Sequence, residues 1–220
     1  MMDVIDWGLI PYSKAYEQQK ELFALALQNK AENKVVENKL ILCEHPPVIT
    51  IGKNGLSANL LFSEKTLKEK NVEFYQVDRG GDVTYHGPGQ LVGYPIFDLE
   101  SFPIGLKEYI HRMEEIIIRT VAPFGIEAER MAGATGVWID TGKAGKARKI
   151  AAIGVRSSRY VTMHGFALNI NTDLSYFRLI NPCGFTDKGV TSLEKETGYV
   201  QDMNVIKESL RINFEQLFQQ

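Results

Sequence analysis

The sequence is poor in cysteine, with only Cys43 and Cys183 in a chain of 220 residues. So few cysteines exclude a scaffold held together by disulfides, and we expect free thiols in a reducing compartment. Histidine is also scarce, and the four histidines and two cysteines show no close metal-ligand spacing. We therefore expect no metal site.

Long apolar runs and an excess of one charge are absent as well. The longest stretch without a charged residue, 83–97, contains three glycines and two prolines, whereas a membrane-spanning helix needs about 20 mostly apolar residues. The N-terminal residues include Asp3 and Asp6 and have no basic stretch before an apolar run, unlike a signal peptide. Lys and Arg number 25 against 27 Asp and Glu, a net charge of −2. We expect a cytoplasmic monomer that binds neither nucleic acid nor membrane.

The pattern of apolar residues predicts the fold class. Amphipathic periodicity predicts helices over 12–30, 106–121 and 204–218. Between them lie strand-like runs at 39–43, 48–51, 72–77, 90–97, 136–140, 149–155, 160–169 and 176–180. Strands that follow one another without a helix pair antiparallel, because parallel crossovers need a dozen or more residues. We predict an α+β fold, with a mixed, largely antiparallel sheet and packed helices, in a single domain over residues 1–220.

Glycine is concentrated in one segment, because five of the 19 glycines lie within residues 79–93. Glycine among strand-like residues marks bulges or a close approach of backbone to a ligand. A dinucleotide-binding pattern starting at Gly87 fails, since its third glycine falls on Val92. A turn-rich surface loop is the alternative. The polar residues Arg79 and His86 among the glycines favour a binding site.

The second candidate is Cys183, between Pro182 and Gly184. Proline fixes the approach of the chain and glycine permits a tight turn behind the sulfur. Such a thiol can be exposed, with neighbouring N–H groups available to an oxyanion. Cys43 lies instead in the apolar run 40–43, and we expect it in the core.

A cysteine thiol with a pKa of about 8.5 needs a base or a cation to react at neutral pH. His86, His164 and Lys149 are the candidates to supply it. Lys149 leads into an apolar strand and follows Lys143, Lys146 and Arg148, the densest basic patch of the chain. We expect this patch to lie near the site and to attract an acidic partner.

Four motifs in order resemble one known family, the lipoyl(octanoyl) transferases. They are RGGDVTYHGPGQLVGY at 79–94, KIAAIGV at 149–155, HGFALNIN at 164–171 and NPCG at 181–184, and the match spans about residues 44–198. The resemblance implies a fold like the catalytic domain of biotin and lipoate protein ligases. It also implies transfer of an octanoyl group from octanoyl-acyl carrier protein to a lysine amine of a lipoyl domain, the first step of protein lipoylation.

The resemblance implies that Cys183 accepts the acyl group as a thioester and that Lys149 activates it. The residues it assigns to substrate binding are Arg79, Gly80, Gly81, Asp82, Val83, Thr84, Tyr85, His86, Ala152, Ile153, Gly154, Gly165, Phe166 and Ala167. The implied acceptors are the lipoyl domains of 2-oxoacid dehydrogenase complexes and the glycine cleavage H protein. No cofactor is expected, because a thioester is already activated.

Three other functions fit parts of this pattern. An ATP-dependent lipoate–protein ligase of the same fold needs no acyl-accepting cysteine. A non-catalytic binder of lipoyl or acyl-carrier domains needs neither Cys183 nor Lys149. A cysteine hydrolase would release a free fatty acid instead of an amide. The presence of both Cys183 and Lys149 favours the transferase.

Overall fold

The computed structural model describes residues 2–181 and 188–218, and its main feature is a large mixed sheet. The strands, in spatial order, are β1 (Asp3–Leu9), β2 (Lys39–Glu44), β6 (Gln90–Ile96), β10 (Val161–Asn169), β9 (Arg148–Ser158), β8 (Ala134–Ile139) and β7 (Ala128–Met131), with β11 (Gly189–Val190) also paired to β9. Neighbours are antiparallel except the pairs β1/β2 and β11/β9. The predicted α+β class with a mixed, largely antiparallel sheet is confirmed.

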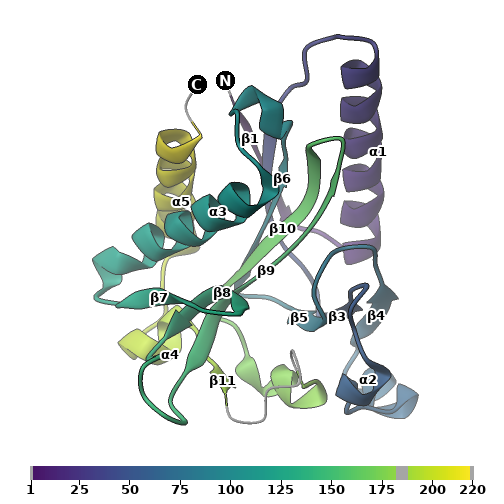
Figure 1. Ribbon diagram of the computed structural model, residues 1–220. Helices are drawn as coiled ribbons and strands as arrows, with labels where there is room; N and C mark the ends of the chain where they lie inside the picture. The colour runs from purple at the N-terminus through teal and green to yellow at the C-terminus, as the bar shows by residue number, and fades with distance from the viewer. Residues whose placement is uncertain (1, 182–187, 219–220) are drawn as a thin grey trace.

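Helices cover both faces of this sheet (Figure 1). Helix α1 (Tyr12–Ala31) packs on one face, and α3 (Leu106–Val121) and α5 (Met203–Leu217) pack on the other. The alternation of side chains along a strand explains both layers. On β2, Leu40 and Leu42 belong to the core beneath α3 and α5, while Ile41 and Cys43 belong to the core beneath α1.

A second, three-stranded sheet lies below α1 in Figure 1. Its order is β4 (Glu73–Gln76), β3 (Val48–Ile51) and β5 (Val83–His86), with β3 parallel to β4 and antiparallel to β5. The glycine-rich segment therefore contains a strand, β5, that was not predicted. The short helices of the described chain are η1 (Ser57–Asn59), α2 (Glu64–Glu69), η2 (Leu99–Ser101), η3 (Ala122–Phe124), η4 (Leu174–Leu179) and α4 (Leu193–Thr197).

The strand predicted over 176–180 is wrong, because η4 occupies most of this segment. Asp173 accepts a hydrogen bond from the backbone N–H of Ser175 at 2.9 Å and so caps the short helix. Its apolar side chains cover β5, where the rings of Tyr176 and Tyr85 stack with centroids 4.9 Å apart. Within residues 2–181 and 188–218, no helix is both long enough and apolar enough to cross a membrane.

Candidate active site

A cavity of about 240 Å³ lies where the large and small sheets meet. The predicted residues that line it are Arg79, Gly81, Asp82, Val83, Thr84, His86, Lys149, Ala152, Ile153, Gly154, Gly165, Phe166 and Ala167. Gly80 and Tyr85 do not line it: Gly80 belongs to the backbone beside it, and the Tyr85 ring packs in the core of the small sheet. Cys183 lies outside the described residues.

Residues 79–82 form an arch, the Arg79–Asp82 arch, that main-chain hydrogen bonds tie to both sheets. Gly80 N donates to Val155 O on β9 at 2.8 Å. On the other side, Lys53 N donates to Arg79 O at 3.1 Å and Asn54 N to Gly81 O at 3.2 Å. This approach is close: an added Cβ at Gly154 would lie only 2.9 Å from Gly80 O. Glycine is therefore required here for backbone contact.

The Arg79 guanidinium is buried beneath the arch, with 8% of the residue exposed. Its Nη2 donates to the carbonyl and hydroxyl oxygens of Thr50 at 3.0 and 3.1 Å, and its Nη1 donates to Gly80 O at 3.0 Å. A buried charge requires such hydrogen bonds. Arg79 thus fixes the shape of the arch and places a positive charge in the wall of the cavity.

His86 begins a chain of polar contacts that runs along the wall of the cavity through Gln90 and Asn169. The Gln90 amide nitrogen donates to Asn169 Oδ1 at 2.8 Å, so the Gln90 oxygen accepts, and His86 Nδ1–H donates to it at 2.7 Å. Asn169 Nδ2 in turn donates to Thr191 O at 2.9 Å. Burial, reinforced by His45, lowers the pKa of His86 to about 3. The imidazole is therefore neutral, with its Nε2 lone pair available as an acceptor.

His45 is also held neutral, because burial lowers its pKa to about 4. Its Nδ1–H donates to Ile10 O at 2.8 Å, and the Tyr94 hydroxyl donates to its Nε2 at 2.6 Å. The neighbouring Cys43 is fully buried, and burial raises the pKa of its thiol. The prediction that Cys43 belongs to the core is confirmed.

His164 lies at one edge of the cavity with an unusual backbone conformation, φ +61°. Such a conformation is rare in residues other than glycine and is often found at functional sites. Its Nε2–H donates to Asp78 Oδ1 at 2.9 Å, and Asp78 also pairs with Arg156. Burial lowers the pKa of His164, and the hydrogen bond from His164 is the main cause that lowers the pKa of Asp78 to about 2.

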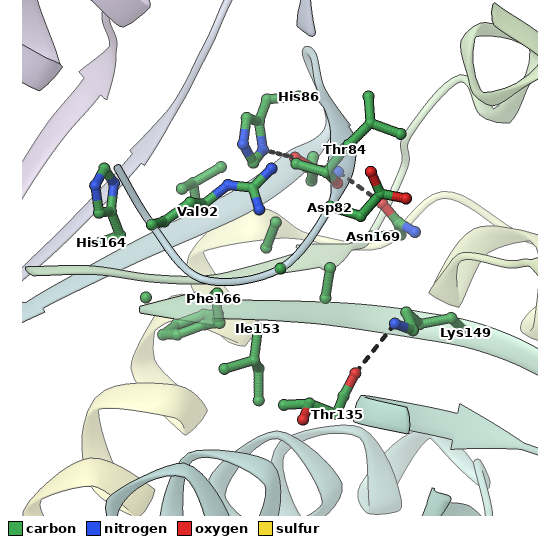
Figure 2. Close-up of a pocket in the computed structure, with 18 of the residues that line it drawn as sticks. Asp82, Thr84, His86, Val92, Thr135, Lys149, Ile153, His164, Phe166 and Asn169 are labelled. Carbon is green, nitrogen blue, oxygen red and sulfur yellow. Dashed lines mark hydrogen bonds between the residues drawn. The ribbon is translucent and has the colours of Figure 1, made fainter. Parts of the chain in front are cut away.

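Lys149 lies across the cavity from His164 (Figure 2). Its side chain runs past Gly136, where an added Cβ would lie 3.4 Å from the lysine Cε. The amine donates to Thr135 O at 3.0 Å and lies 4.6 Å from the centroid of the Trp138 ring. A carbonyl oxygen and an aromatic face are both groups that contact lysine amines in proteins. These contacts hold the amine at one end of the cavity.

The basic patch predicted beside Lys149 is largely neutralised. Arg148 makes a bidentate ion pair with Glu196, with both N–O distances at 2.6 Å, and it also pairs with Asp140. Lys143 pairs with the same Asp140 at 2.5 Å. Two of the three cations are thus engaged within the chain. The expectation that this patch supplies the attraction for an acidic partner loses its physical basis.

Several residues of the site could not be assigned from sequence. Gln90 on β6 hydrogen-bonds His86, and Asn169 on the neighbouring strand β10 hydrogen-bonds Gln90. Tyr12 stacks on His86 from α1 with ring centroids 6.1 Å apart. The motif 79–94 includes Gln90, but only the pairing of the strands shows its partner. Tyr12 belongs to the apolar face of an amphipathic helix, and nothing in that pattern indicates a binding site.

The two neutral buried histidines predict acid instability. Unfolding lets each imidazole bind a proton below pH 6.5, whereas in the fold His45 and His86 stay neutral until about pH 4 and 3. Their contribution to stability is therefore complete above pH 6.5 and is lost as the pH falls. We expect the free energy of unfolding to drop by about 4 kcal/mol between pH 7 and pH 5 from these two groups.

Urea unfolding at both pH values measures this loss. His45→Gln should be less stable at pH 7 but should lose less stability on acidification. His111→Gln is the matched control, because His111 is exposed on α3, and it should behave as the wild type. An unchanged free energy of unfolding between pH 7 and pH 5 would contradict the prediction.

Comparison with known proteins shows the family of the chain. The sequence profile of the lipoyl protein ligase A/B catalytic domain matches residues 15–215. A curated octanoyltransferase of Parabacteroides distasonis is 59% identical over 213 residues, 97% of this chain and 96% of the relative. One from Bacteroides fragilis is 56% identical over 205 residues, 93% of this chain and 92% of the relative.

Solved structures share the fold at low identity. A bipartite lipoate protein ligase of Thermoplasma acidophilum, studied with its E2 lipoyl domain, matches with a TM-score of 0.71 and 14% identity, over 99% of this chain and 84% of the other. The apo biotin protein ligase of Aquifex aeolicus matches with a TM-score of 0.52 and 10% identity, over 99% and 68%. The resemblance seen in the motifs is confirmed. The chain therefore belongs to the lipoyl protein ligase A/B catalytic domain family, in which the curated relatives named above are octanoyltransferases.

Proposed function

We propose that the protein transfers an octanoyl group from the thioester of an acyl carrier protein to a lysine amine of a lipoyl domain. The observation that carries this proposal is the identity of 59% over nearly the whole chain with a curated octanoyltransferase. The cavity supports it independently. Val83, Val92, Ile153 and Phe166 give it apolar walls, and burial of an eight-carbon chain contributes roughly 0.8 kcal/mol for each methylene.

The proposed reaction has two steps through Cys183. The thiolate of Cys183 attacks the thioester carbonyl, the bond to the carrier sulfur breaks, and the carrier thiol leaves with a proton. The acceptor amine then attacks the new octanoyl thioester, the Cys183 sulfur leaves, and an amide forms as the amine gives up a proton. The reaction needs neither ATP nor a metal, because the free energy of the carrier thioester is retained in the octanoyl thioester on Cys183.

Lys149 is the residue we propose for moving these protons. As an ammonium it stabilises the Cys183 thiolate, and as a neutral amine it accepts the proton of the attacking lysine. The lysine of the acceptor has an ordinary pKa of about 10.4 and needs such a base. The Arg79–Asp82 arch and strand β10 at Gly165–Ala167 then hold the acyl chain on the two sides of the cavity.

We further propose that residues 1–220 form one catalytic domain, which acts as a monomer in the cytoplasm. Its donor is octanoyl-acyl carrier protein, and its acceptors are the lipoyl domains of 2-oxoacid dehydrogenase complexes and the glycine cleavage H protein.

Intact-mass spectrometry tests the function. The purified protein is mixed with octanoyl carrier protein and a lipoyl domain, without ATP. We expect an octanoyl adduct on the enzyme and then an octanoyl amide on the acceptor. Amide formation only from free octanoate plus ATP would instead identify a ligase. Release of free octanoate without amide would identify a hydrolase.

A further inference from the structure

The cavity between the two sheets has an open end and a closed end. Near Lys149, the lining residues Gly133 and Thr135 are exposed to solvent. Figure 2 shows His86 and His164 well apart from Lys149 and Thr135, on the other side of the cavity. At this closed end the lining residues are buried, and they are Tyr12, His86, Tyr94 and His164, with 3, 8, 4 and 2% of each residue exposed.

Two stacked rings form part of the closed end. The Tyr12 ring from α1 and the His86 ring from β5 are nearly parallel, with planes 9° apart and centroids 6.1 Å apart. The Tyr16 and His45 rings pack against Tyr12 as well, with centroids at 6.0 and 5.4 Å. These contacts fix the two rings, so their polar atoms have fixed places in the wall of the cavity.

The polar atoms of this stacked pair have hydrogen-bonding capacity to spare. Tyr94 and His164 are hydrogen-bonded to other side chains. In the described part of the chain, by contrast, the Tyr12 hydroxyl makes no hydrogen bond, and the His86 ring makes one, from Nδ1 to Gln90. A donor on Tyr12 and an acceptor, Nε2, on His86 are thus left over in the lining. Buried polar groups nearly always have partners, so this pair indicates contact with solvent or with a polar ligand.

We propose that Tyr12 and His86 limit the length of the acyl chain that the enzyme transfers. This inference rests on the proposed function, because it concerns the tail of the same acyl group. With the thioester at Lys149, the tail extends toward the closed end. A tail that stops short of the pair leaves both polar atoms in contact with water. A longer tail places its methyl group against them and offers no hydrogen bond in return, which is unfavourable for buried polar atoms.

The same contact predicts a class of long chains that the enzyme accepts. A tail that ends in a hydroxyl group can accept a hydrogen bond from Tyr12 and donate one to His86 Nε2. The 9-hydroxynonanoyl group differs from decanoyl only in that a hydroxyl replaces the terminal methyl. We therefore expect ω-hydroxyacyl chains to be transferred better than alkyl chains of the same length.

The experiment compares carrier protein loaded with octanoyl, decanoyl or 9-hydroxynonanoyl groups, and amide formation on the lipoyl domain gives kcat/KM for each. The wild type should transfer decanoyl less well than octanoyl, although two further methylenes add apolar surface to bury. It should transfer 9-hydroxynonanoyl about tenfold better than decanoyl, the effect expected when a buried polar group regains a partner.

Tyr12→Phe removes the hydroxyl and keeps the ring. We expect it to raise the ratio of the decanoyl to the octanoyl kcat/KM about tenfold and to reduce the advantage of 9-hydroxynonanoyl over decanoyl. Tyr75→Phe is the matched control, because the Tyr75 ring contacts Tyr12 at 5.2 Å but its hydroxyl donates to Glu73 at 3.2 Å, outside the cavity lining. It should keep the ratios of the wild type. A ratio taken within one variant does not depend on how much of the enzyme is folded.

Two results would overturn the inference. If Tyr12→Phe keeps the ratio of the wild type while Tyr12→Ala raises it, space alone limits the chain. If the wild type transfers 9-hydroxynonanoyl no better than decanoyl, the polar atoms do not contact the tail. Failure of the wild type to transfer any of the three groups would instead contradict the proposed function, and this result is distinct from the other two.

Discussion

Cys183→Ala is expected to form neither an octanoyl adduct nor an acceptor amide, whereas Cys43→Ala keeps both. The thioester mechanism has no second nucleophile for the acyl group, so the loss is complete. Cys43 is the internal control, because its thiol is expected to be unreactive. It is fully buried in the core beneath α1, and burial raises the pKa of its thiol, which keeps it protonated and unreactive.

Intact-mass spectrometry followed by peptide mapping measures this result. The expected spectrum shows one octanoyl group on the wild type and on Cys43→Ala, mapped to Cys183 in both. An adduct mapped to Cys43, or amide synthesis that survives in Cys183→Ala, would rule out the thioester route. Thermal unfolding of both variants checks that the fold is retained.

Lys149→Ala is expected to lower kcat/KM by about 10²–10⁴-fold, the usual contribution of a positioned acid–base group. Both half-reactions should slow, because one amine stabilises the thiolate and later takes the proton of the acceptor lysine. Lys149→Arg separates these roles. Arginine keeps the positive charge but stays protonated, so it cannot serve as the base.

Two measurements distinguish the two roles of Lys149. Alkylation of the Cys183 thiol at neutral pH reports the thiolate, and amide synthesis reports the whole reaction. We expect Lys149→Arg to recover alkylation better than amide synthesis. Lys146→Ala, on the loop before β9 and outside the cavity lining, is the control. If Lys149→Ala is alkylated and turns over like the wild type, His86 or His164 becomes the candidate base.

Repeating patterns in the sequence predict the larger part of the fold. The three long helices have clear apolar faces, and the structure places them close to their predicted residues. The segment 176–180 shows the limit of this approach. Its apolar residues suit a buried strand or a packed short helix equally, and the cap at Asp173 together with the Tyr85 ring decides for the helix. A local cap and a ring contact from a distant residue thus decide the structure of this segment.

The candidate site was also predictable from the sequence only in part. Glycines and polar residues in one segment indicated the Arg79–Asp82 arch and His86, because close backbone contact requires glycine. Asn169 gave no such signal, because it is 79 positions from Gln90 along the chain. Only the pairing of β10 with β6 brings the two side chains together. The basic patch shows the opposite case, because a clear pattern in the sequence was misleading. Lys143 and Arg148 are close together in the sequence, but both side chains form ion pairs with carboxylates of the same chain.

The Arg79–Asp82 arch has a consequence for how this protein tolerates mutation. The arch is held by the backbone N–H groups of Lys53 and Asn54, which any residue except proline supplies equally well. Substitutions at these two positions should therefore leave the wall of the cavity in place. A Cβ at Gly52 or Gly154, by contrast, would lie 2.5 or 2.9 Å from a carbonyl oxygen of the arch. We therefore expect related sequences to carry varied residues at positions 53 and 54 and to keep glycine at position 52.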